Sequence, residues 1–240
     1  MRGGRRREMH EGFRAGTGLY RLFWFFVVGS VAGFVLEGLW SLVYWGHWSH
    51  HAGVVWGPYC TIYGLGFVAM QTASDLCVRG SQSRLRRALT LFCVCAVAGS
   101  LVEYMVSYVQ ENVFGSVSWD YSDQPLNLNG RVSLMMTVVW GLLGVFFAEL
   151  VSPGMETLVS SIRGGAGYAV TWALIVFLSV DMLVSAAAVK RWQQRGESIP
   201  PQNVVEAALD ESFGDERMER LFPNMQFTQI GSYSYAAHGA

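Results

Sequence analysis

Residues Leu22–Tyr44 read LFWFFVVGSVAGFVLEGLWSLVY and contain one charged residue, Glu37. A membrane crossing by an α-helix needs about 20 consecutive apolar residues, so this stretch is long enough to span a bilayer. It follows a basic segment, as the apolar part of a signal peptide would. However, it is too long for a signal peptide, and no small-residue cleavage pattern follows it. We therefore predict a retained transmembrane helix.

Four further apolar stretches of similar length follow, at residues 54–77, 88–109, 132–151 and 168–188. Backbone groups in hydrocarbon must form their hydrogen bonds within the segment, so we expect helices and not strands. The composition agrees, because 52% of the 240 residues are hydrophobic and only 15% are charged. Soluble domains contain about 25% charged residues. The predicted fold class is therefore all-α, a polytopic transmembrane bundle of about five spanning helices in a lipid bilayer.

The chain divides into a basic N-terminus (1–21), a membrane domain (22–190) and a polar, acidic C-terminal tail (191–240). Eleven arginines fall on one side of the predicted bilayer: Arg2, Arg5, Arg6, Arg7, Arg14, Arg21, Arg79, Arg84, Arg86, Arg87 and Arg163. The positive-inside rule then places the N-terminus in the cytoplasm. Five crossings leave the tail outside, together with Lys190, Arg191 and Arg195. Either one segment is re-entrant, or the stronger N-terminal bias prevails.

Several classes of protein are disfavoured. A formal net charge of −1 gives no basic field for nucleic acid, and four cysteines are too few for a disulfide-stapled domain. The Gly64-x-Gly-x-x-Ala69 pattern lies in an apolar span, so we interpret it as a helix-packing face and predict no cofactor. His47, His50 and His51 have a spacing that a helical turn could present to a metal, but we favour a solvated loop. The sequence has no P-loop.

Three acids lie inside the predicted spans at similar depth. At 1.5 Å per residue, Glu37, Glu103 and Asp181 each lie roughly 9–10 Å inside the outer end of their helix. An ionised group at mid-membrane costs on the order of 3 kcal/mol, so we expect these side chains to face inward to a shared, hydrated cavity. The alternative is that each acid binds a separate Tyr, Trp or Ser neighbour and only holds the helices together.

The outer loop, residues 111–131, is the longest between the predicted spans. Its mixture of aromatic, amide and acidic side chains predicts a compact, hydrogen-bonded loop packed on the mouth of the bundle. Arg131 lies near several acids, and its guanidinium suits a carboxylate. It either locks the loop in place or contacts a ligand.

Five ordered motifs carry a resemblance to a known family: Gly57-Pro-Tyr-Cys-Thr-Ile-Tyr-Gly64, Glu103-Tyr104, Trp119-Asp-Tyr-Ser-Asp123, Asn127-x-Asn-Gly-Arg131 and Trp140-Gly141. With Asp215-Glu-Arg-Met and Phe222-Pro-Asn-Met225 in the tail, the chain resembles the putative ABC-transporter type IV (CmpB-like) family from Phe23 to Met225. Thr61 stands where that family usually has proline, which predicts a softer turn. The resemblance implies a multi-pass protein of the bacterial inner membrane that is a permease needing a separate ATPase subunit.

The leading hypothesis is therefore a permease component whose acidic outer cavity handles a cation, a proton or a cationic solute. The predicted substrate-binding residues are Glu37, Glu103, Glu111, Trp119, Asp120, Asp123, Asn127, Arg131 and Asp181. The second hypothesis is a membrane scaffold or sensor that binds a partner through its tail. A third is an intramembrane enzyme that uses paired carboxylates, although no catalytic residue is predicted. The sequence leaves a homo-oligomer open.

Overall fold

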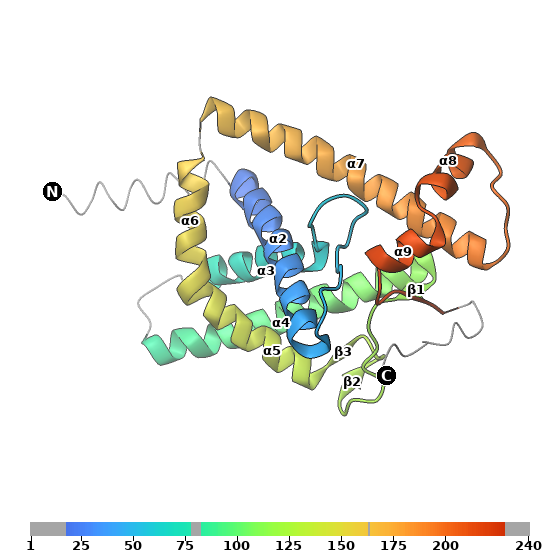
Figure 1. Ribbon diagram of the computed structural model, residues 1–240. Helices are drawn as coiled ribbons and strands as arrows, with labels where there is room; N and C mark the ends of the chain where they lie inside the picture. Colours follow the sequence, from blue (N-terminus) through green and yellow to red (C-terminus); the bar gives the residue numbers. More distant parts are fainter. Residues whose placement is uncertain (1–17, 78–82, 163, 229–240) are drawn as a thin grey trace.

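The computed structural model describes residues 18–77, 83–162 and 164–228 of the chain. The helices are α2 (Gly18–Trp45), α3 (Thr61–Cys77), α4 (Arg84–Phe114), α5 (Leu134–Phe146), α6 (Ser152–Ser161), α7 (Gly165–Gly196), α8 (Val204–Ser212) and α9 (Asp215–Leu221) (Figure 1). The strands have two residues each: β1 (Ser116–Val117), β2 (Asn127–Leu128), β3 (Val132–Ser133) and β4 (Gln226–Phe227). The predicted all-α fold is confirmed. Most of the basic N-terminus, Arg79, Arg163 and residues 229–240 lie outside the described residues.

Four helical runs are long and apolar enough to cross a membrane: Gly18–Trp45, Arg84–Phe114, Leu134–Ser161 and Gly165–Gly196. The predicted second span, residues 54–77, differs, because its helix begins only at Thr61. Proline suits the first residue of a helix, where its missing N–H is not needed. The turn expected at Thr61 is therefore the start of α3. With 17 residues, α3 packs against both α2 and α4.

Small residues bring α2 and α3 into close contact. A Cβ atom on Gly33 would overlap the ring of Tyr63, and one on Gly29 would overlap Phe67. On the opposing helix, a Cβ on Gly64 would overlap Phe26 and Ser30. Gly29 and Gly33 thus form the packing face of α2, and Gly64 packs against that helix from α3, as the sequence indicated for Gly64.

The run from α5 to α6 is interrupted in its middle. Residues Phe147–Val151 form a π-helical turn, η1, and Pro153 stands in the first turn of α6. A π-turn and a proline both disturb the i→i−4 hydrogen-bond ladder. The helix bends there (Figure 1) and continues to Ser161, beyond the predicted end at residue 151.

The C-terminal region folds back onto the bundle. Helix α7 extends to Gly196, past the predicted end at residue 188, and α8 and α9 return toward it. Their apolar side chains form a buried cluster with α7 and the loop before α3: Val55, Ala188, Val189, Phe213, Met218 and Phe222. Beyond α9, β4 pairs antiparallel with β1, with Val117 opposite Gln226. Gln226 and Phe227 of the acidic tail are therefore part of the folded structure.

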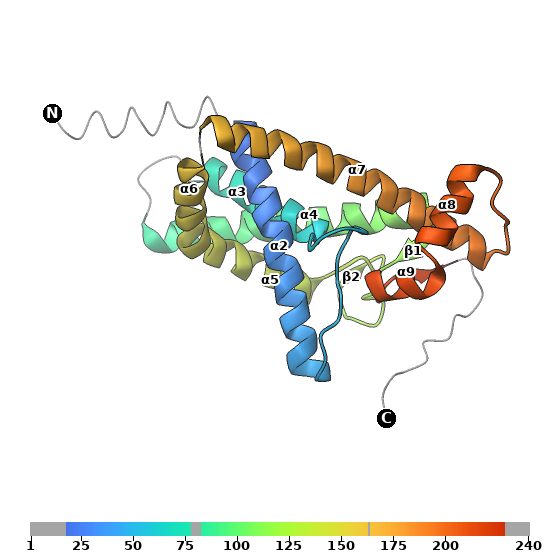
Figure 2. The ribbon, with the colours of Figure 1, turned by 45° about the horizontal axis from the view of Figure 1, so that its top comes forward.

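This pairing places the C-terminal segment at the same end of the bundle as the loop of residues 115–131 (Figure 2). That arrangement fits an odd number of crossings. Lys190, Arg191 and Arg195 form the basic cluster that conflicted with the positive-inside rule. Acids of the C-terminal region neutralise the two arginines. Asp210 binds the guanidinium groups of Arg191 and Arg195, each at 2.6 Å, and Asp215 binds Arg195 at 2.7 Å. These ion pairs lower the pKa of Asp210.

A second polar network holds the opposite end of the bundle. Arg21 on α2 is 8% exposed and binds both carboxylate oxygens of Asp75 on α3, at 2.7 and 3.1 Å. Its Nε donates to Glu156 on α6 at 2.5 Å. Gln71 donates to Asp75 at 3.0 Å and accepts from Ser152 at 2.7 Å. One guanidinium thus ties three helices together.

Replacing Arg21 with methionine should destabilise the protein, because the length of the side chain is kept while Asp75 and Glu156 lose their counter-charge. Breaking a buried ion pair costs about 3–5 kcal/mol, and the partly exposed carboxylates reduce this to about 1–3 kcal/mol. The measurement is the melting temperature in detergent. Leu19→Ala, at a neighbouring residue that is 86% exposed, is the control. An Arg21→Met protein that melts with the control would contradict this structural role.

Candidate functional site

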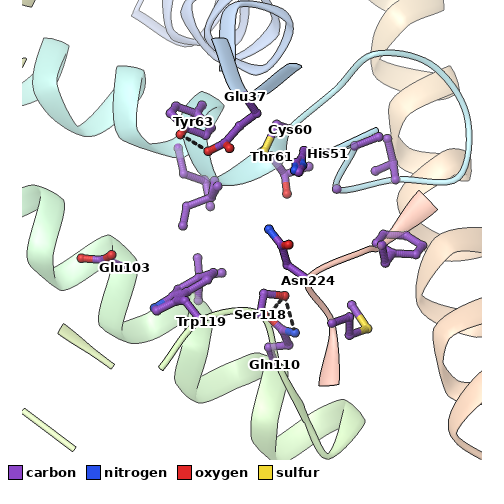
Figure 3. Close-up of a pocket in the computed structure, with 18 of the residues that line it drawn as sticks. Glu37, His51, Cys60, Thr61, Tyr63, Glu103, Gln110, Ser118, Trp119 and Asn224 are labelled. Carbon is purple, nitrogen blue, oxygen red and sulfur yellow. Dashed lines mark hydrogen bonds between the residues drawn. The ribbon is translucent and has the colours of Figure 1, made fainter. Parts of the chain in front are cut away.

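A cavity of about 800 Å³ lies between the two polar networks. Its walls come from α2, the 46–60 loop, α3, α4, the 115–131 loop, α5, α7 and the segment after α9. Figure 3 shows side chains on two sides of this cavity. Glu37, Tyr63 and His51 lie on one side, and Gln110, Ser118 and Asn224 lie on the other. The volume is that of a small-molecule site, which typically measures about 300–1,000 Å³.

Glu37 lines one wall. Its carboxylate accepts a hydrogen bond from the hydroxyl of Tyr63 on α3, close to where α3 crosses Gly33. The close helix contact therefore also positions the acid and its partner. His51 and Cys60, from the loop before α3, line the same wall. Burial lowers the pKa of His51 against the attraction of Glu37, and burial raises the pKa of Cys60 to about 12. Both groups are therefore uncharged at neutral pH.

Glu103 lines another wall, and 3% of it is exposed. One carboxylate oxygen accepts from Tyr121 at 2.9 Å, and the other accepts from Trp140 Nε1 at 3.0 Å. Tyr121 comes from the outer loop and Trp140 from α5, so Glu103 joins the loop to two helices. Burial and the adjacent Glu103 raise the pKa of Tyr121, which keeps the phenol protonated as a donor.

Asp181 does not join the other two acids. It is 0% exposed and is absent from the described cavity lining. One carboxylate oxygen accepts from the backbone N–H of Trp56 at 3.1 Å and from Ser185 at 3.3 Å. Ser185 in turn accepts from the N–H of Val55 at 2.8 Å. Asp181 thus fixes the loop before α3 onto α7, which corresponds to the separate-partner alternative.

The outer loop is compact, but most of its polar side chains bind within the loop. Asp120 accepts from the N–H and hydroxyl of Ser122, at 2.8 and 2.5 Å, and these bonds lower its pKa. Asn127 accepts from the N–H of Gly130 at 3.0 Å and donates to the carbonyl of Gln124 at 2.8 Å. Asp123 is exposed. Of the loop residues proposed for substrate binding, only Trp119 is in the described lining.

Arg131 holds this loop on α4. Its guanidinium binds Glu111 at 2.5 Å, donates to Ser107 at 3.3 Å and lies over the rings of Tyr104 and Tyr108. Its backbone carbonyl accepts from Trp119 Nε1 at 3.0 Å. Neither Arg131 nor Glu111 is in the described lining, so their geometry is that of the lock and not of ligand contact.

Sequence reasoning missed the segment after α9 as part of the site. Leu221, Phe222, Pro223, Asn224 and Met225 all line the cavity. Their place is fixed on one side by the apolar cluster around Phe222 and on the other by the pairing of β4 with β1. The Phe222-Pro-Asn-Met225 motif was the available signal, but nothing in it indicates which end of the bundle the tail reaches.

The three loop histidines do not converge. His47 contacts the carbonyl of Trp45, His50 packs on Phe34, and His51 contacts Ser41. Among the described residues, no group of three His, Cys, Asp or Glu side chains is placed to hold a metal ion.

The electrostatics of the cavity are one-sided. Two glutamates line it, whereas its described lining contains no lysine or arginine. Arg131 and Arg191, which lie outside the described lining, bind Glu111 and Asp210 instead. The described lining therefore holds two carboxyl groups and no arginine or lysine to pair with them.

Comparison with known proteins identifies a family. A family model described as "Putative ABC-transporter type IV" matches residues 24–186, which covers the membrane helices and the outer loop. No curated protein and no solved structure matches.

The wall formed by the C-terminal segment can be tested by cross-linking. Val117→Cys and Gln226→Cys, in a background without the native cysteines, should form a disulfide under mild oxidation. Paired residues of antiparallel strands lie about 4.5–5.5 Å apart, within disulfide range. Val117→Cys with Ser198→Cys is the matched control and should stay reduced. Equal cross-linking of both pairs, or of neither, would contradict this placement.

Proposed function

The chain belongs to the putative ABC-transporter type IV family, and from this membership and the cavity we propose that it is a permease component that handles a cation, a proton or a cationic solute. It is a membrane protein with several spanning helices, and its family description is that of a transporter and not of an enzyme. We place it in the bacterial inner membrane, with its N-terminus in the cytoplasm.

The observation that carries this proposal is the placement of Glu37 and Glu103. They come from different helices, yet both line one cavity that has no lysine or arginine in its described lining. In a site shielded from water, a carboxylate attracts a cation much more strongly than it does in solution. The neighbouring phenols of Tyr63 and Tyr121 hold the two carboxylates in place.

The two ends of the bundle differ in a way that suits a transporter. The Arg21 network closes the end away from the cavity with buried ion pairs, whereas the cavity end is covered by a loop and a short C-terminal segment. Alternating access requires two such closures that open in turn. A permease of this family would also need a separate ATPase, because this sequence has no P-loop.

A scaffold or sensor is the second candidate, and one observation favours it. Each of the three acids has its own hydrogen-bond donor, as a purely structural acid would. The tail offers less support, because Asp210 and Asp215 are bound to arginines of α7. A partner would have to recognise the remaining exposed acids of the described tail, Glu197, Glu211, Glu216 and Glu219.

Glu37→Gln separates the two functions. The glutamine carbonyl can still accept from Tyr63, so the hydrogen bond is kept while the charge is lost. For a permease, uptake of the transported cation into membrane vesicles of the source cells, which contain any ATPase partner, should fall at least tenfold, with rubidium, methylammonium and tetraphenylphosphonium as probes and pyranine reporting protons. A tenfold loss corresponds to about 1.4 kcal/mol, less than a charge interaction in a shielded site provides. The detergent melting temperature should stay unchanged.

Asp123→Asn is the matched control, because it removes an exposed carboxylate of the outer loop. A scaffold would show no specific uptake of any probe by the parent protein, and its melting temperature would fall with Glu37→Gln and Tyr63→Phe alike. That pattern would overturn the permease assignment.

A further inference from the structure

We propose that the cavity binds a hydrophobic organic cation that reaches it sideways from the bilayer, between α7 and the α4–α5 pair. This inference rests on the proposed function and narrows its substrate class. The observations that carry it are the apolar composition of the walls, the location of the two carboxylates, and the exposure of lining residues in the middle of the helices.

The walls are mostly apolar. Many of the lining residues are aliphatic or methionine side chains from α3, α4, α5 and α7, among them Leu65, Met105, Val109, Leu143 and Met182. A hydrated metal ion would lose its water here without gaining enough oxygen ligands in return. A cation such as Ca²⁺ takes about six to eight of them. An organic cation with an apolar body loses far less, because its body is stabilised by the same walls.

The polar groups suit the charged part of such a molecule. Glu37 and Glu103 supply negative charge, and four aromatic residues line the cavity near them: Tyr63, Trp119, Tyr121 and Trp140. Aromatic rings attract organic cations through their negative faces. His51 adds no opposing charge, because its buried ring is neutral.

The route follows from where the lining is exposed. Leu65, Met105, Val109, Leu143 and Met182 line the cavity and are nevertheless between 41% and 48% exposed. All but Leu65 lie within helices long and apolar enough to cross a membrane, so the surroundings those four face are hydrocarbon and not water. Ser185, Ala186 and Val189 of α7 also line the cavity.

The end nearest the loops is lined by other segments. Trp119 from the outer loop and Asn224 from the C-terminal segment face the cavity (Figure 3), and Phe222 and Met225 also line it. These segments are held by strand pairing and by the buried cluster around Phe222. A solute that partitions into the bilayer therefore meets an open side of the cavity, whereas a solute in water meets the segments that line this end.

The test is equilibrium binding to the full chain in phosphatidylcholine nanodiscs, with binding to empty nanodiscs subtracted. Three probes separate charge from hydrophobicity: tetraphenylphosphonium, the anion tetraphenylborate of the same shape, and tetramethylammonium, a cation without the large apolar body. Tetraphenylphosphonium should bind at least tenfold more tightly than either of the others. Glu37→Gln and Glu103→Gln should each weaken it about tenfold, and Asp123→Asn should leave it unchanged.

Two variants of neighbouring residues on α5 test the proposed route from the bilayer. Leu143 lines the cavity, whereas its neighbour Leu142 is 60% exposed and is absent from the described lining. Leu143→Trp should slow the association of tetraphenylphosphonium at least fivefold relative to Leu142→Trp. Equal association rates for these two variants would overturn the lateral route.

The remaining outcomes distinguish this inference from the proposed function. If methylammonium or rubidium is transported in a Glu37-dependent way and tetraphenylphosphonium does not bind, the substrate class is wrong and the permease stands. If tetraphenylphosphonium and tetraphenylborate bind equally and the glutamine variants bind as the parent does, the carboxylates recognise no cation, and both proposals fall. A variant that does not fold is recognised by its melting temperature and replaced by Glu37→Asp, which should retain binding.

Discussion

An ionised side chain in hydrocarbon costs several kcal/mol unless it is paired or faces a polar space, and this cost shapes both ends of the bundle. At the end near the N-terminus, Arg21 meets the requirement by direct pairing with Asp75 and Glu156. At the other end, Glu37 and Glu103 have only neutral donors and face a cavity. The first arrangement pairs opposite charges directly, whereas the described lining of the cavity has no lysine or arginine to pair with the two glutamates.

The difference between the acids also separates structural from binding groups. Asp181 is fully buried among backbone N–H groups and a serine, so it anchors the loop that carries His51 and Cys60. Glu111 forms an ion pair with Arg131, and this pair anchors the loop that carries Trp119 and Tyr121. These two anchors lie outside the cavity and position the residues that line it. The site therefore depends on acids that do not themselves belong to it.

Much of the architecture could be predicted from the sequence, because uninterrupted apolar length is a strong local signal. The spans around Glu37 and Glu103 and the compact outer loop follow from it. The start of α3 did not, because Val54, Val55 and Trp56 are apolar but belong to a loop whose backbone binds Asp181 and Ser185. Likewise, counting residues along each helix predicted that the three acids lie at one depth. The direction of each acidic side chain depends instead on packing partners such as Tyr63 and Trp140. Sequence spacing alone does not specify those partners.

The pairing of β1 with β4 has a consequence for biogenesis. The backbone N–H and hydroxyl of Thr228 both bind the carbonyl of Gly115, 113 residues away along the chain. Every membrane helix leaves the ribosome before this contact can form. A chain stopped after α7 lacks α8 and α9, so Val55, Ala188 and Val189 are without Phe213, Met218 and Phe222, the side chains that cover them. The wall that the segment after α9 contributes to the cavity is likewise absent until that segment has been made.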